Sequence, residues 1–195
     1  IFDLIKIIIK HKNIKSYCEI GVDKGETLNK VKKIKIIDAI GVDPFRIADI
    51  KKSSDNFFKT NKRKFDLIFI DGLHEFDQVL RDFENSIQST NEDGIILIDD
   101  CLPSSFNEQL IPRIQRKWTG DTWKLLFLIN ELDFEYIISN CQSGIGIVKV
   151  NKSKLKYIKD LDINRFKKLD FNYFCENYKK LNIKNYSETI NFVKN

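Results

Sequence analysis

The sequence has no Cys-x-x-Cys pair, although it contains four cysteines in 195 residues. They stand far apart, at Cys18, Cys101, Cys141 and Cys175. Neither a zinc site built on paired thiolates nor a disulfide framework is therefore indicated. The spacing fits a reducing compartment, and we expect a cytoplasmic location.

Long hydrophobic runs are also absent. No stretch approaches the roughly 18 uncharged apolar residues that predict a membrane-spanning helix, so no membrane partner is expected. Residues 1–9 are largely apolar, but Asp3 and Lys6 interrupt them at helical spacing, which predicts an amphipathic helix. No small-residue cleavage site of a signal peptide follows this segment. The first residue is isoleucine and not methionine, which leaves open whether the natural N-terminus lies upstream.

A concentrated block of basic residues is the third missing feature. The net charge is +5, but the lysines are spread among isoleucine and asparagine residues. This distribution is typical of a solvated lysine-rich surface, and a nucleic-acid partner is not indicated. With 42% hydrophobic and 12% aromatic residues, the chain can bury roughly 70% of its unfolded surface in one core.

Segments with strand patterns and segments with helix patterns alternate along the chain. Strands are predicted at residues 17–22, 36–42, 65–70, 95–98, 134–139 and 144–150. Helices are predicted from residue 25, over 76–87 in about three turns, and over 105–117 and 122–132. Residues 45–64 have a weak pattern, into which a third strand and a short helix would have to fit. The alternation predicts an open α/β sheet with right-handed crossovers and helices on both faces.

The end of the chain differs from the rest in composition. Residues 151–195 are rich in lysine, asparagine, tyrosine and phenylalanine. Their apolar positions, including Leu169, Phe174 and Leu181, suggest a helical appendage that packs on the α/β domain formed by residues 1–150. We find no internal repeat and no linker.

The most informative segment is Ser16-Tyr-Cys-Glu-Ile-Gly-Val-Asp-Lys-Gly-Glu-Thr27, in which Glu19 precedes Gly21 and Gly25. Asp43 follows 18 residues after Gly25, at the end of the next predicted strand, as a βαβ nucleoside site requires. Glu19 and Asp23 would repel a pyrophosphate. The loop suits a ligand with a cationic amino-acid end, while Asp43 accepts hydrogen bonds from ribose hydroxyls. S-adenosylmethionine is such a ligand.

With this loop, the chain resembles the class I S-adenosylmethionine-dependent methyltransferases. Two further segments, Asp66-Leu-Ile-Phe-Ile-Asp-Gly-Leu-His-Glu-Phe-Asp-Gln-Val-Leu-Arg-Asp82 and Gly94-Ile-Ile-Leu-Ile-Asp-Asp-Cys-Leu-Pro103, are similar to a branch that methylates small molecules in bacterial sugar-modifying and secondary-metabolite pathways. The resemblance covers about residues 1–150. It implies a Rossmann-like, mostly parallel seven-stranded sheet with an antiparallel last strand. It also implies that Ser54 and Asp55 contact the adenine and that Asp71 contributes to the cofactor site.

Acidic residues follow several predicted strands, at Glu19, Asp43, Asp71, Asp99 and Asp100. Since ligands of open parallel sheets collect at the carboxyl ends of strands, these side chains should share one rim. His74 lies on the same rim and is the best candidate for the base that removes a proton from a hydroxyl acceptor. The alternative is that His74 caps the following helix or orders its loop. Asp71 and Asp100 complete the expected catalytic group.

Asp71, Asp99 and Asp100 also suggest a Mg²⁺ site that polarises the acceptor oxygen, as in related O-methyltransferases. The sequence departs from the Asp-x-Asp pattern of those enzymes at Leu73. In the competing interpretation, Asp71 and Asp99 cap helices while Asp100 contacts the substrate.

The resemblance implies transfer of a methyl group to an oxygen of a small molecule, such as a sugar or a nucleotide-linked sugar. Trp118, Asp121 and Trp123 could form the wall of the acceptor site or pack in the core. A nucleic-acid methyltransferase is an alternative, although no Asn-Pro-Pro-Tyr or Asp-Pro-Pro-Tyr motif is present. A catalytically silent cofactor-binding subunit is another. A homodimer is compatible with each of these functions.

Overall fold

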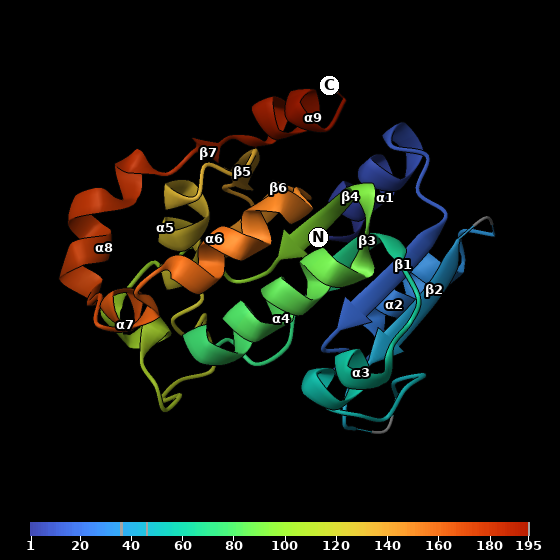
Figure 1. The fold of residues 1–195 in the computed structure, drawn as a ribbon, viewed down its shortest axis with the longest axis horizontal. Coiled ribbons are helices and arrows are strands. Elements are labelled where there is room, and N and C mark those ends of the chain that lie inside the picture. Colours follow the sequence, from blue (N-terminus) through green and yellow to red (C-terminus); the bar gives the residue numbers. More distant parts are fainter. Residues whose placement is uncertain (36, 46, 195) are drawn as a thin grey trace.

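The computed structural model describes residues 1–35, 37–45 and 47–194, and its centre is a seven-stranded sheet of order β2-β1-β3-β4-β6-β5-β7 (Figure 1). The strands are β1 (Ser16–Ile20), β2 (Asp38–Val42), β3 (Phe65–Ile70), β4 (Thr90–Ile98), β5 (Tyr136–Ser139), β6 (Ile145–Lys149) and β7 (Ile183–Lys184). β6 runs antiparallel between β4 and β5, whereas the other pairs are parallel. The expected mostly parallel sheet with an antiparallel closing strand is confirmed.

The seventh strand is not the one that the sequence suggested. The sequence predicts a third strand within residues 45–64, but in the described residues 45 and 47–64 the structure has a parallel bridge from Ile50 to Val42, followed by the helix α3 (Ser54–Thr60). Lys51, Lys52 and Ser53 follow the bridge, and polar residues give an edge strand no apolar face to bury. Ser53 caps α3 instead, because its side chain accepts from the backbone of Asn56. The seventh strand is β7, which pairs with β5 from the tail of the chain. Residue 36, the start of the predicted second strand, lies outside the described residues.

Helices cover both faces of the sheet because alternate strand residues point to opposite sides. On one face, Ile68 and Ile70 of β3 pack in a buried cluster with helices α3 to α8; on the other, Leu67 and Phe69 pack with α1, α2 and α9. The helices are α1 (Phe2–His11), α2 (Glu26–Lys32), α3 (Ser54–Thr60), α4 (Phe76–Ser89), α5 (Trp123–Glu131), α6 (Leu155–Asp160), α7 (Ile163–Lys167), α8 (Phe171–Asn177) and α9 (Tyr186–Lys194). Among the described helices, none is long and apolar enough to cross a membrane.

The predicted helix over residues 105–117 is wrong. Only the short 3-10 turn η1 (Phe106–Gln109) forms, and an irregular segment leads from it to α5. Pro112 has no N–H to donate and disfavours helical backbone in the residue before it. The carbonyl of Glu108 accepts from the backbone N–H groups of Thr119 and Gly120, at 2.9 and 3.2 Å, which closes the segment into a loop. The next predicted helix is confirmed as α5.

The tail packs on the rest of the chain. Its residues Ile158, Phe166, Phe174 and Leu181 are buried in the same cluster as one face of the sheet. The tail also contains two 3-10 turns: η2 (Lys152–Lys154) directly precedes α6, and η3 (Tyr178–Lys180) directly follows α8. Helix α9, the last helix of the chain, returns to contact α1, the first. The division at residue 150 stays a prediction.

Candidate active site

A cavity of about 590 Å³ opens at the carboxyl ends of β1, β2 and β3. This is the edge at which ligands bind to open α/β sheets, and the volume falls in the usual range for a small-molecule site. Residues that the sequence singled out line it together with residues that it did not, among them Gly21, Asp43, Ser54, Asp71, Asp82 and Arg113.

The loop after β1 can approach the cavity closely because it contains two glycines. Gly21 has a φ of +86°, and a Cβ at this position would lie 2.0 Å from the carbonyl oxygen of Asp71. Only glycine fits between the ends of β1 and β3 in this conformation. Gly25, with a φ of +74°, is the residue from which α2 begins. The backbone at Gly21 is therefore exposed to a ligand.

Asp43 joins the loops that follow β1 and β2. Its Oδ2 accepts from the backbone N–H of Val22 at 2.9 Å, and its Oδ1 accepts from the N–H of Phe45 at 2.8 Å. The carboxylate also lines the cavity. A carboxylate has about four acceptor sites, so acceptor capacity remains for hydroxyl groups of a ligand.

Glu19 lies beneath this loop. It is buried, and its Oε2 accepts from the hydroxyl of Tyr17 at 2.6 Å. Among the described residues it is not part of the cavity lining. Burial raises the pKa of Glu19 to about 7, although the hydrogen bond from Tyr17 opposes the rise. A positive charge bound nearby would favour its ionised form.

The two residues predicted for adenine binding lie differently. Ser54 lines the cavity, whereas Asp55 forms an exposed ion pair with Arg81, in which Nε and Oδ1 are 3.4 Å apart. Gln78 and Asp82 of α4 also line the cavity, and the sequence analysis did not single them out. The available signal was that Asp82 falls on the apolar face of α4.

His74 lies between two of the strand-end carboxylates, Asp71 and Asp100. Its Nε2 is 3.4 Å from Oδ2 of Asp100 and 3.7 Å from Oδ1 of Asp71. Trp118 contacts the imidazole edge-on, with ring centroids 5.8 Å apart. Burial lowers the pKa of His74, and the positive charge of Arg113 lowers it further, while Asp99 raises it. The imidazole is therefore held in its neutral form, which can accept a proton.

The backbone on the far side of His74 is held by the segment before α5. The carbonyl of His74 accepts from the N–H of Asp121 at 3.0 Å, and Oδ1 of Asp121 accepts from the N–H of Phe76 at 2.6 Å. Asp121 thus satisfies the start of α4 instead of forming an acceptor wall. Trp123 is fully buried in the core. Of the three residues considered for the acceptor wall, Trp118 packs against the imidazole ring of His74, whereas Asp121 bonds the backbone of His74.

The structure brings Asp71, Asp99 and Asp100 together at the ends of β3 and β4. Burial raises the pKa of Asp71 well above its ordinary value, and the nearby Asp99, Asp100 and Glu19 raise it further. Oδ1 of Asp99 accepts from the N–H of Asp100 at 2.9 Å. Within residues 1–35, 37–45 and 47–194, no group of three or more His, Cys, Asp or Glu side chains is arranged to hold a metal ion.

The comparisons with known proteins agree with this geometry. Residues 18–101 match a family described as a methyltransferase domain. An uncharacterized protein of Acanthamoeba polyphaga mimivirus is 27% identical over 128 residues, which are 52% of this chain; the chain spans 58% of that relative's length.

Two solved structures show the same fold. One is a candidate caffeoyl-CoA O-methyltransferase from Staphylococcus aureus, with a TM-score of 0.62 and 20% identity over 77% of this chain and 82% of that one. The other is the plantazolicin methyltransferase BpumL in complex with S-adenosylhomocysteine, with a TM-score of 0.55 and 14% identity over 77% and 82%.

Residues 18–101 are therefore similar to a methyltransferase domain. The chain as a whole shares its fold with solved methyltransferases, one of them a candidate O-methyltransferase.

Proposed function

We propose that this protein transfers a methyl group from S-adenosylmethionine to a hydroxyl oxygen of a small molecule. The observation that carries the proposal is the position of His74, a neutral base beside Asp100 and beside Asp71, which lines the cavity. A silent cofactor-binding subunit would need no such base. The acceptor we propose is a sugar or a nucleotide-linked sugar.

The cavity has the groups that the cofactor requires. Gly21 lets the backbone approach the amino-acid end, and Asp43 accepts from the ribose hydroxyls. Glu19 and Asp71 have raised pKa values, and a cationic ligand stabilises the ionised forms of both carboxyls. Two further residues complete the site: α2 begins from Gly25, and Ser54 lines the cavity. When bound, S-adenosylmethionine supplies an electrophilic methyl group.

The residues of this chain align the acceptor and remove its proton. Methyl transfer from a sulfonium neutralises charge, so alignment and proton removal are the main tasks. Nε2 of His74 would accept the hydroxyl proton as the oxygen forms its bond to the methyl carbon, while the bond from that carbon to sulfur breaks and S-adenosylhomocysteine leaves as the neutral thioether. The adjacent carboxylate of Asp100 stabilises the resulting imidazolium, since their atoms are 3.4 Å apart.

The acceptor side combines an indole ring with a cation. Arg113 lines the cavity and lies over Trp118, with 5.7 Å between its guanidinium carbon and the ring centroid. In the described part of the chain, Arg113 forms no ion pair with a carboxylate. An indole face suits a sugar ring, and a guanidinium suits the phosphates of a nucleotide-linked sugar. Both features support the proposed acceptor.

Magnesium is not part of this mechanism. Asp71, Asp99 and Asp100 form no metal-holding group among the described residues, so we derive no step through the ion. The cap interpretation fits neither Asp71 nor Asp99 in the described part of the chain. The N-cap position of α4 is Glu75, and Asp99 accepts from the N–H of the adjacent Asp100, where no helix begins. Metal dependence, a homodimer and a cytoplasmic location stay predictions.

Calorimetric binding of S-adenosylhomocysteine tests the proposed function directly. Wild type should bind it, and Asp43→Ala should weaken binding by about 2–3 kcal/mol, because hydrogen bonds to a charged group are lost. Asp38→Ala, at the opposite and exposed end of β2, is the matched control and should bind like wild type. Absence of binding to wild type would exclude the cofactor, and an unchanged affinity in Asp43→Ala would exclude its role.

A further inference from the structure

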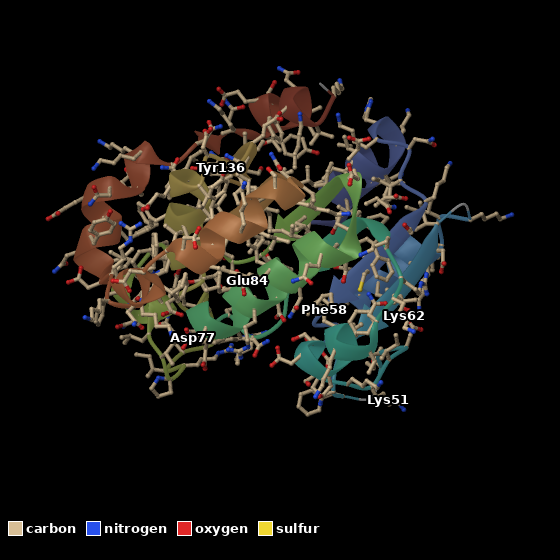
Figure 2. All side chains as sticks on the ribbon, in the orientation of Figure 1. Lys51, Phe58, Lys62, Asp77, Glu84 and Tyr136 are labelled. Atoms are coloured by element: carbon tan, nitrogen blue, oxygen red, sulfur yellow. The ribbon has the colours of Figure 1, made fainter. Side chains whose placement is uncertain are left out.

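Helix α4 carries a buried carboxyl group that the mechanism above does not use. Asp82 is 1% exposed and lies among Val79 and Phe83 on the apolar face of the helix. Other acidic residues of α4, such as Asp77 and Glu84, lie along the same helix without this burial (Figure 2). Burying a carboxylate is costly unless hydrogen-bond donors compensate it.

The protein supplies part of this compensation. Nε2 of Gln78 is 3.1 Å from Oδ1 of Asp82 and 3.1 Å from Oγ of Ser54, which links α3 to α4. Burial raises the pKa of Asp82 to about 6, while hydrogen bonds from Ser54 and Gln78 oppose the rise. A carboxylate accepts about four hydrogen bonds, so these two donors leave acceptor capacity.

The remaining capacity faces the cavity. Asp82, Gln78 and Ser54 all line it. Oδ2 of Asp82 would be 3.9 Å from a Cβ at Gly72, so this oxygen lies next to the turn after β3, which also lines the cavity. A ligand with an N–H donor can therefore reach a buried, ionised acceptor on the cavity wall.

We propose that Asp82 binds the exocyclic amino group of the cofactor's adenine and so favours adenosyl ligands over nucleosides whose base lacks this amino group. The inference rests on the proposed function and adds the residue that recognises the base. Adenine presents ring nitrogens that only accept, whereas its 6-amino group donates, and a carboxylate can bind only the donor. Asp82 thus takes the role that the resemblance suggested for Asp55, which pairs with Arg81 instead.

Two ligands that differ only in the amino group test the proposal. Calorimetry at pH 8, where Asp82 is ionised, compares S-adenosylhomocysteine with its purine-riboside analogue, which lacks the 6-amino group. Wild type should bind the adenosyl compound roughly 10- to 100-fold more tightly, as expected for a hydrogen bond to a buried charged group. In Asp82→Asn this ratio should fall by about tenfold, because a neutral acceptor forms the weaker bond.

Asp55→Asn is the matched control, since Asp55 also neighbours Gln78 but is exposed. It should keep the wild-type ratio. Equal binding of both ligands to wild type would overturn the proposal without any variant, and so would a loss of selectivity in Asp55→Asn but not in Asp82→Asn. If wild type bound neither ligand, the proposed function itself would fail, which is a distinguishable result.

Discussion

At the scale of single residues, opposing electrostatic effects set the pKa of His74. Burial and Arg113 favour the neutral imidazole, and Asp99 favours the charged form. The first two dominate, so the pKa of His74 lies below its ordinary value. A base in this state is available to accept a proton at neutral pH.

We expect the imidazole of His74 to titrate below the ordinary value of about 6.5. Arg113→Gln should raise the pKa of His74, because it removes a positive charge that opposes protonation. NMR titration of the two histidines measures this, and His11→Gln assigns their signals. A pKa of His74 above the ordinary value would mean that Asp99 outweighs burial and Arg113.

The protonation state of His74 should also control the rate of turnover. Turnover should rise with pH through the pKa of His74 and then level off, because only the neutral form accepts a proton. His74→Ala should lower kcat by about 100- to 10,000-fold while the affinity for S-adenosylhomocysteine stays near that of wild type. If only KM rises in the variant, His74 positions the acceptor and another group removes the proton.

At the scale of elements, the site depends on how closely two strand ends approach. The N–H of Asp71 donates to the carbonyl of Ile20 at 2.8 Å, and the N–H of Gly21 donates to Val42 at 2.9 Å. These bonds continue the parallel pairing of β3, β1 and β2 one residue past the strands. They hold the glycine loop and Asp71 at a common edge.

Gly21→Ala should therefore destabilise the protein by about 3 kcal/mol or more. The added Cβ would clash with the carbonyl of Asp71, and alanine is strained at a φ of +86°. Gly72→Ala is the control, because its Cβ would meet atoms only at 3.7 Å and beyond, and stability should stay within about 1 kcal/mol of wild type. Urea unfolding measures both, and equal stability of the two variants would contradict the argument.

At the scale of the whole molecule, the interior contains ionisable groups as well as two apolar clusters. Burial raises the pKa of Glu19 to about 7 and that of Asp82 to about 6. In the unfolded chain these groups have pKa values of about 4. Between about pH 4 and pH 7, the folded protein therefore binds more protons than the unfolded chain does.

The free energy of unfolding should consequently fall as pH rises through this window. The stability is fully present below about pH 4 and is lost by about pH 7, up to about 3 kcal/mol for each group. His74 acts in the opposite sense, because the pKa of its imidazole is lowered. Urea unfolding of the ligand-free protein at pH 5 and pH 8 tests the net sign. Glu19→Gln should flatten the slope, Asp77→Asn should not, and a stability that increases toward pH 8 in wild type would refute the argument.

The sequence by itself determined the central strands and the residues at their ends. The run 65–70 is β3 to the residue, and Asp43, Asp71 and Asp100 lie at the rim where parallel strands predict them. These features depend on short-range pattern, since a buried strand is a local apolar run and its last residue is read directly from the chain.

Only the tertiary structure decided which polar residues face the cavity and which serve the fold. Asp121 bonds Phe76, 45 positions away, and Gln78 bonds Ser54 across 24 positions. The loop before α5 and the strand β7 likewise depend on partners distant in sequence. Local pattern carries no information on such pairs, because a carboxylate that caps a helix, pairs with an arginine or lines a cavity looks the same along the chain until folding selects its neighbour.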